Sequence, residues 1–304
     1  MAFLMLLILI GYLLCKLNAV PAIGAGILSK LENNVFIPAL VLGTFMKNFT
    51  LQRLNVAWQY FLGGFVLVAL NIVLALFISR VMAKDDYTRK IYTYGLAFPN
   101  FAFMGNAVVS ALFPDVFMEY LIFTLPFWIL IYLWGVPSLL IPSDDGKRTL
   151  KDRLKTFLNP MFIGMLVGMV LGLLNPPLPS FLQNSVNTLG NCMSPIAMLL
   201  TGLTIAKIDL KATFKNLSIY AVSLVRVLVL PAIAVVTISF LPLSEGLAIC
   251  STCLMAMPLG LNTIVIPSAY GKDTSVAAGL ALISHLLSCV SIPLIFMLFD
   301  VLTK

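Results

Sequence analysis

The chain has 304 residues, of which 61% are hydrophobic and 10% are charged, and its formal net charge is +7. Soluble domains carry about 25% charged residues, so this chain has too little charge to cover a water-exposed surface. The composition predicts a polytopic membrane protein and excludes a soluble globular fold.

A transmembrane helix needs about 20 predominantly apolar residues, and ten stretches of the chain meet this requirement. The first stretch begins MAFLM, without the basic residue or the small-residue cleavage site of a secretory signal, so we expect a retained helix. The ten predicted helices span residues 1–17, 30–47, 54–80, 88–113, 116–141, 157–174, 186–206, 215–240, 246–270 and 275–301.

The fourth and ninth predicted helices are both interrupted. Residues 97–106 read AFPNFAFMGN, and residues 256–271 read AMPLGLNTIVIPSAYG. Proline lacks a backbone N–H and clashes with the preceding turn, so breaks are expected near Pro99 and Pro258. Irregular backbone at membrane depth is tolerated only where protein buries it or a cavity solvates it. Each break is therefore a packed kink or part of a binding site.

The polar segment at residues 143–155 divides the predicted helices into five and five. Because five is odd, the second half must be inverted in the membrane. Identities between the halves fall on Gly, Asn and Pro: at an offset of 157 they are Gly11 and Gly168, Asn18 and Asn175, Asn34 and Asn191, and Pro38 and Pro195. At an offset of 159, Pro99 matches Pro258. We therefore predict an all-α fold of two inverted five-helix repeats, residues 1–141 and 157–304, joined by a cytoplasmic linker at 142–156.

Interrupted segments at matching positions of two inverted halves indicate the binding site of a transporter. The half-helices that begin after Asn100 and Asn262 each direct the positive end of a helix dipole into the membrane. Two such ends form an anion site. A second pair of matched prolines bends the helices that carry Thr44 and Thr201, whose hydroxyls either line the crossing or bond to their own helices.

Few ionisable residues fall inside the predicted helices. No Asp or Glu lies deep in a span, and Glu32 is expected at a cytoplasmic edge, so a carboxylate-driven mechanism is not expected. Arg226 lies about eleven residues into the eighth helix, roughly 16 Å deep. It must reach the surface, bond to carbonyls at a half-helix C-terminus, or attract an anion. His285, the only histidine of the chain, is either a core residue satisfied by hydrogen bonds or a proton carrier.

The distribution of Lys and Arg sets the orientation. Loops after odd-numbered helices carry fifteen basic residues, and the opposite side carries three: Lys47, Arg53 and Lys304. Basic residues favour the cytoplasm, so both termini are expected to be extracytoplasmic, in a multi-pass protein of the cell (inner) membrane. The charges are split among short loops, so nucleic-acid binding is not expected.

Five stretches resemble the auxin efflux carrier family: IGYLLCKL, LSKLENNVFIPALVLGTF, LAFPNFAFMGNAVVSALF, AMPLGLN and AYGKDTSVAAGLALISHLLSCVSIPL. This family includes plant PIN carriers and bacterial relatives such as malonate-type carriers, and its fold is similar to that of bile acid:sodium symporters. The resemblance covers essentially the whole chain, although the long hydrophilic central loop of many plant carriers is missing. It implies ten helices in two inverted repeats, with helices four and nine broken and crossing at proline.

The resemblance also implies transport of small organic anions by a homodimer, with a scaffold domain and an elevator-like transport domain that are each built from both repeats. By position, Pro99 and Pro258 would be the crossover prolines, with Asn100 and Asn262 near the substrate carboxylate. Further substrate-binding residues expected from the residues and the resemblance are Phe101, Gly260, Thr263, Thr44 and Thr201.

We therefore predict a carrier that exports small organic anions, in particular carboxylates. A sodium-coupled organic-anion symporter, and a channel or substrate-sensing receptor on the same fold, are the alternatives. An enzyme is not expected, because G-x-S-x-G, H-E-x-x-H and paired deep aspartates are absent. No cofactor or metal is expected. The expected partners are the organic anion, membrane lipid and a second copy of the chain.

The charge asymmetry predicts that Lys304 is extracytoplasmic. A C-terminal fusion should give signal from a reporter that is active only outside the cytoplasm, because basic loops are retained on the cytoplasmic side. The control is the same pair of reporters inserted in the linker at 142–156, where the outcome should be reversed. A cytoplasmic signal alone from the C-terminal fusion would contradict both the topology and the inverted repeat.

Overall fold

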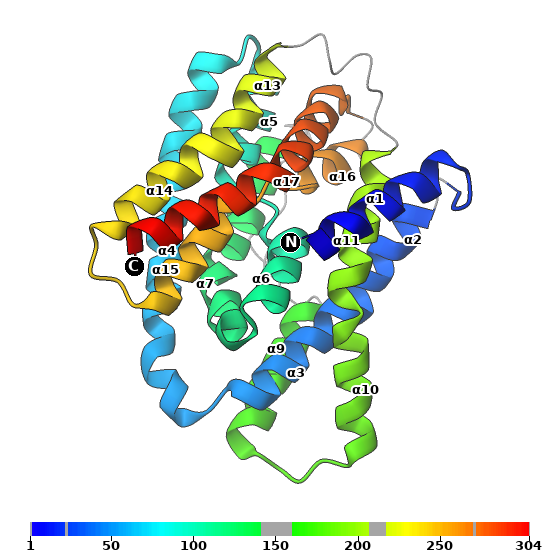
Figure 1. Cartoon of the computed structure of the whole chain (residues 1–304), viewed down its shortest axis with the longest axis vertical. Helices are drawn as coiled ribbons and strands as arrows, with labels where there is room; N and C mark the ends of the chain where they lie inside the picture. Colours follow the sequence, from blue (N-terminus) through cyan, green and yellow to red (C-terminus); the bar gives the residue numbers. More distant parts are fainter. Residues whose placement is uncertain (1, 22–23, 141–159, 207–216, 270–271, 304) are drawn as a thin grey trace. The chain divides into compact units, whose positions relative to one another are not determined.

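Helices make up almost all of the computed structural model, which describes residues 2–21, 24–140, 160–206, 217–269 and 272–303 (Figure 1). Within these residues, five helical stretches are long and apolar enough to cross a membrane: Gly24–Asn48, Asn55–Met82, Pro114–Leu140, Leu217–Ser239 and Ser275–Thr303. Shorter apolar helices cover Leu6–Lys16, Phe101–Leu112, Pro160–Leu174 and Glu245–Ala256. The all-α class is confirmed for the described part of the chain, and the helices fit a multi-pass membrane protein. Ten spans in inverted repeats stay a prediction.

The chain divides into two compact units. Unit 1 contains residues 1–61, 106–122 and 149–207, and unit 2 contains residues 62–105, 123–148 and 208–304. Each unit therefore takes segments from both sides of the predicted linker, which itself lies outside the described residues. That the units act as scaffold and transport domains stays a prediction.

Unit 1 is built from helices that pair across its separate chain segments. Its main helices are α1 (Ala2–Lys16), α3 (Ile37–Asn48), α9 (Pro160–Leu174), α10 (Ser180–Asn191) and α11 (Met193–Ile205), with the shorter α2 (Gly24–Leu31), η1 (Glu32–Phe36), α6 (Asn106–Leu112) and η3 (Pro114–Val116). α1 packs against α11, and α3 packs against α9 and α10 (Figure 1). Helices from the N-terminal half of the chain thus pack mainly against helices from its C-terminal half.

Two glycines allow these close helix contacts. A Cβ added to Gly11 would lie 2.2 Å from the Leu199 carbonyl oxygen, and one added to Gly168 would lie 2.8 Å from the Leu42 carbonyl oxygen. Small residues let helix backbones approach closely in membranes. Gly11 and Gly168 are 157 residues apart, and so are the residues that they contact, Leu42 and Leu199. The contact of α1 with α11 therefore has its counterpart in the contact of α9 with α3.

The ends of α1 and α9 match in the same way. Asn18 and Asn175, which share the 157-residue offset, follow these helices and have positive φ angles of 56° and 44°. Among the described non-glycine residues, they are the two with this conformation. Asparagine tolerates the left-handed region better than most residues, so each can turn the chain after its helix.

Unit 2 contains both helix breaks and the helix that packs beside them. Its helices are the later part of α4 (Leu51–Met82), α5 (Asp86–Ala97), η2 (Phe101–Gly105), the later part of α7 (Phe117–Leu130), η4 (Ile131–Leu140), α13 (Leu217–Leu224), η6 (Val225–Val229), α14 (Leu230–Ser239), α15 (Glu245–Ala256), α16 (Asn262–Ala269) and α17 (Ser275–Thr303). α17 packs against α13, η6, α14 and α15. This arrangement surrounds both helix breaks with protein.

The helices before the two breaks are matched in length and position. α5 and α15 have 12 residues each. α5 ends at Ala97, two residues before Pro99, and α15 ends at Ala256, two residues before Pro258. All four positions are related by the offset of 159, as are the first residues of the two helices.

Matched caps begin these two helices. The Asp85 carboxylate accepts a 2.8 Å hydrogen bond from the Thr88 N–H, and the Ser244 hydroxyl accepts one of 3.4 Å from the Leu247 N–H. Such caps satisfy amides that have no partner within the helix. The Thr88 N–H lowers the pKa of the Asp85 carboxyl, which lies in the turn before α5. Ionised Asp85 therefore stabilises this helix start.

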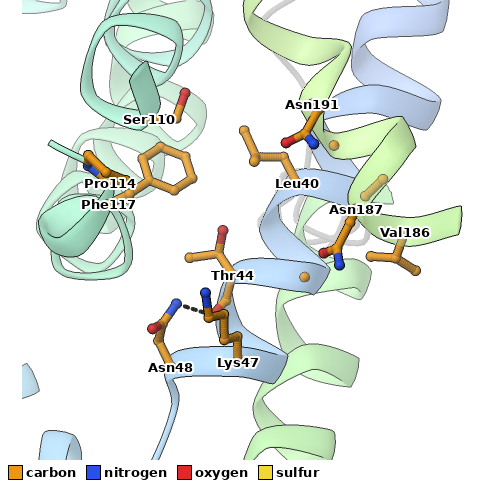
Figure 2. Close-up of a pocket in the computed structure, with 13 residues that line it drawn as sticks. Leu40, Thr44, Lys47, Asn48, Ser110, Pro114, Phe117, Val186, Asn187 and Asn191 are labelled. Atoms are coloured by element: carbon orange, nitrogen blue, oxygen red, sulfur yellow. Dashed lines mark hydrogen bonds between the residues drawn. The ribbon is translucent and has the colours of Figure 1, made fainter. Parts of the chain in front are cut away.

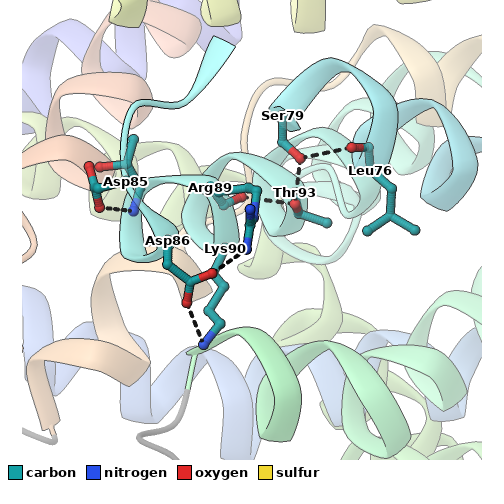
Figure 3. A network of polar contacts seen from close by, with 8 residues as sticks. Leu76, Ser79, Asp85, Asp86, Arg89, Lys90 and Thr93 are labelled. Atoms are coloured by element: carbon teal, nitrogen blue, oxygen red, sulfur yellow. Dashed lines mark hydrogen bonds and ion pairs between the residues drawn. The ribbon is translucent and has the colours of Figure 1, made fainter. Parts of the chain in front are cut away.

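Figure 3 shows the polar contacts at the junction of α4 and α5. The Ser79 and Thr93 hydroxyls lie 2.8 Å apart and join the two helices in a buried position. On the exposed side of α5, Asp86 pairs with Lys90 at 3.0 Å and also with Arg89. The buried hydroxyl pair holds α5 in place while the ion pairs stay in solvent, where such pairs contribute little.

Substitution of Gly202 is expected to destabilise unit 1. A Cβ at this α11 position would lie 2.0 Å from the Ile8 carbonyl oxygen of α1, and overpacking costs about 1–3 kcal/mol. Gly202→Ala should therefore lower the melting temperature of the detergent-purified protein. The matched control is Gly26→Ala, because no atom lies within 4 Å of a Cβ built there and alanine favours a helix by about 0.5–1 kcal/mol. Equal melting temperatures for the two variants would contradict the close α1–α11 contact.

Candidate functional site

The two helix breaks of unit 2 cross each other. Pro99 and Leu259 form an isolated antiparallel bridge, and the Asn100 N–H donates to the Pro258 carbonyl oxygen at 2.8 Å. A Cβ added to Gly260 would lie 3.0 Å from the Phe98 carbonyl oxygen. Each break thus supplies partners for the other, which backbone at membrane depth requires.

Asn100 is tied into the crossing by three hydrogen bonds. Besides the bond from its N–H, its carbonyl oxygen accepts from the Gly105 N–H at 2.9 Å. Its side-chain nitrogen lies 3.1 Å from Nε2 of His285 on α17. The side chain is almost fully buried, with 3% exposed. Asn100 therefore has a fixed orientation, with one amide N–H and its side-chain oxygen left for another partner.

His285 is satisfied at both ring nitrogens. Its Nδ1 lies 2.7 Å from the Ala281 carbonyl oxygen. A carbonyl oxygen can only accept, so Nδ1 carries the proton of the neutral ring, and Nε2 accepts from the Asn100 amide. This geometry is that of a core histidine that orients its neighbour. A role of His285 in proton coupling stays a prediction.

The second break is held in part by Tyr94 and Ser284, which the sequence analysis did not single out. The Asn262 amide donates to the Tyr94 hydroxyl at 3.3 Å, and the Leu259 N–H donates to the Ser284 hydroxyl at 3.3 Å. Thr263, which is buried, donates to the Gly260 carbonyl oxygen at 2.8 Å. Polar residues inside apolar helices were the available signal for Tyr94 and Ser284, and it does not distinguish structural from functional positions.

Arg226 lies at the C-terminal ends of the two interrupted helices. Its Nε donates to the Met257 carbonyl oxygen at 3.1 Å, and its terminal nitrogens donate to the carbonyl oxygens of Leu96, Leu254 and Met255 at 3.4, 3.3 and 3.0 Å. The side chain is fully buried, and no described carboxylate forms an ion pair with it. Arg226 was expected to reach the surface, to bond to carbonyls at a half-helix C-terminus, or to attract an anion. The structure shows hydrogen bonds to carbonyl oxygens.

Aromatic side chains pack around the first break. Phe98 lies 5.0 Å from Tyr94 and 6.2 Å from Trp134 between ring centroids, and Phe101 lies 5.2 Å from Trp128. Phe98, Phe101 and also Met257 are buried. These residues therefore belong to the core of unit 2 in this structure, whereas Phe103 keeps part of its surface exposed.

Unit 1 contains a separate polar cavity of about 240 Å³ between α3, α10 and the chain around Pro114 (Figure 2). Thr44 lines it, together with Lys47, Asn48, Asn187 and Asn191 among others. The amide side chains of α10 lie four residues apart and so share one helix face. Thr201 instead donates to the Ala197 carbonyl oxygen of its own helix at 2.8 Å and is buried. Lining of the crossing by Thr44 and Thr201 stays a prediction.

The depth of Glu32 in the membrane, expected at the cytoplasmic edge of a span, stays a prediction. Its side chain is fully buried in η1 of unit 1, and neither carboxyl oxygen has a hydrogen-bond partner in the described structure. Burying a polar group without a hydrogen bond costs free energy. The helical period around Glu32 did not reveal this burial, because burial here depends on α9, α10 and α11 from the second half of the chain.

The crossing separates two kinds of helix end. The C-terminal ends of α5 and α15 present carbonyl oxygens, which accept hydrogen bonds from the guanidinium of Arg226. The helical stretch that begins at Phe101 and helix α16 instead present N–H groups at their N-termini. Helix N-termini attract anions. Among the described residues, no group of three or more His, Cys, Asp or Glu could hold a metal ion. The N-terminal side of the crossing can therefore attract an anion.

A family model described as membrane transport protein matches residues 1–296, which is almost the full chain. No curated protein matches it.

Proposed function

Since the chain belongs to the membrane transport protein family, which is the auxin efflux carrier family, we propose that it is a secondary carrier that exports small organic anions. The suspected resemblance to this family is confirmed. We further place the substrate at the crossing of the two interrupted helices and infer that it moves by an elevator-like alternating-access mechanism. The carrier acts in the cell (inner) membrane as a homodimer.

The separation of charge at the crossing carries this proposal. Helix N-termini supply about +0.5 each, and the negative C-terminal ends of α5 and α15 are already neutralised by Arg226. The N-terminal ends of the two half-helices therefore keep an uncompensated partial positive charge. The buried amide of Asn100 and the half-buried amide of Asn262 lie beside these N-termini, where a carboxylate would accept hydrogen bonds from them.

Matched features support the inverted repeat on which an elevator mechanism depends. The Gly11 and Gly168 contacts, the Asn18 and Asn175 conformations, and the lengths and caps of α5 and α15 each recur at an offset of 157 or 159 residues. Chance similarity between apolar helices would not place a cap, a break and a left-handed residue in register. Ten helices, five in each orientation, are the arrangement that fits these pairs.

The substrate that suits this site is a monoanionic carboxylate with an apolar body. A single anion balances the positive N-terminal ends, and the part-exposed Phe103 offers apolar surface next to them. An inside-negative membrane potential favours export of such an anion by about 2.3 kcal/mol per charge per 100 mV. Uncoupled efflux therefore needs no co-transported ion.

Two observations define the alternatives. The carbonyl oxygens around Arg226 are the type of ligand that a sodium-coupled symporter would use, but here a side chain occupies them. The buried Glu32 of unit 1 favours a second candidate, in which the anion moves together with a proton that this carboxyl accepts. A channel or substrate-sensing receptor on the same fold would lack saturable counterflow.

The amides of Asn100 and Asn262 are expected to be needed for transport. Asn100→Ala and Asn262→Ala should each weaken carboxylate binding about 10–150-fold, since one hydrogen bond to a charged group contributes about 1.5–3 kcal/mol. Binding is measured by isothermal calorimetry on folded, monodisperse protein. Asn33→Ala is the matched control, because Asn33 bonds to Ser29 of its own helical turn. Unchanged binding in both crossing variants would move the site elsewhere.

Uncoupled anion transport predicts the sign and ion dependence of the current. Reconstituted protein on a solid support should give currents of negative charge when carboxylates are added, with the same amplitude in sodium and in choline. Glu32→Gln should behave as wild type, because the uncoupled mechanism uses no buried acid. Currents that require sodium would favour the symporter, and currents that require a proton gradient and disappear in Glu32→Gln would favour the proton-coupled candidate.

A further inference from the structure

Arg226 is held in a π-helical turn, η6, between α13 and α14. Its guanidinium reaches four backbone carbonyl oxygens that come from both interrupted helices. We call the carbonyls of Leu96, Leu254, Met255 and Met257 the carbonyl cluster. All of them belong to unit 2.

The carbonyl cluster is a place of concentrated negative potential. The last four carbonyls of a helix have no partner inside the helix, and they form the negative end of its dipole. Leu96 lies in the last turn of α5, and Leu254 and Met255 lie in the last turn of α15. Two helix C-termini therefore converge on one buried point, which requires a positive charge.

Half-helix C-termini and unwound carbonyls are the groups that coordinate a monovalent cation in transporters with broken helices. We propose that the carbonyl cluster is a monovalent-cation site that this chain fills with its own Arg226. Because the Arg226 side chain supplies the positive charge, the stability of the crossing does not depend on sodium or potassium from solution.

The hydrogen bonds of Arg226 support this role over that of a substrate ligand. Four of its five N–H groups are used by carbonyls. No described carboxylate shares the site, so dipoles alone compensate the charge. A buried charge without compensation is strongly destabilising, so the guanidinium depends on the carbonyl cluster for its stability.

Removal of the side chain should open the site to free cations. In Arg226→Ala, sodium, potassium or millimolar guanidinium chloride should raise the melting temperature of the detergent-purified protein relative to choline chloride at the same ionic strength. An ion at about ten times its dissociation constant should shift the midpoint by about 2 °C in a chain of this length. Wild type should show no such shift. No substrate is present, so this result does not depend on the proposed function.

Two further variants complete the test. Arg226→Lys keeps a tethered cation and should stay insensitive to these ions. Arg80→Ala removes an exposed arginine of unit 2, so it should gain no ion dependence. If Arg226→Ala aggregates in choline, extraction with guanidinium or sodium should recover monodisperse protein. A folded Arg226→Ala that no ion stabilises would overturn the proposal, as would failure of both Arg226 variants to fold in every medium.

Discussion

Unpaired backbone at membrane depth is the constraint on which the structure of unit 2 depends. Breaking a helix frees N–H and C=O groups whose burial costs several kcal/mol each when they are left unpaired. Here each break supplies hydrogen-bond partners for the other. The Pro99–Leu259 bridge and the hydrogen bond from the Asn100 N–H to the Pro258 carbonyl oxygen pair backbone with backbone. Arg226 donates hydrogen bonds to further backbone carbonyl oxygens. The crossing is therefore stable only as a whole, which explains why α17 and η6 pack against it.

This constraint also separates charge. Crossing two broken helices places two negative and two positive helix ends close together. No described Asp or Glu of unit 2 is buried, so this unit compensates only the negative ends, with its own cation. Arg226 does so from a third helix. The positive N-terminal ends lie beside Asn100 and Asn262, and in our proposal the substrate anion compensates their charge. The same backbone geometry thus accounts both for the buried arginine and for the anion affinity that we propose.

Much of this could be predicted from sequence because proline acts locally. Pro99 and Pro258 remove a donor wherever they stand, so the ends of α5 at Ala97 and α15 at Ala256 follow from short stretches of residues. The family resemblance rested on the same stretches. The partners of the crossing could not be predicted in this way. His285 meets Asn100 across 185 positions of sequence, and no periodicity within either helix contains that contact.

Glu32 shows what local reasoning leaves out. Its position near the start of an apolar stretch predicts a membrane edge but does not predict its burial, which involves helices from the other half of the chain that pack against η1. Burial in a fold with intertwined halves is decided by the partner half, so hydropathy around a residue underestimates it. The same intertwining joins Gly11 to α11 and Gly168 to α3. The buried ionisable residues of the described structure include Arg226 and Glu32, and ionisable residues inside a membrane protein are functional candidates because burying them is costly.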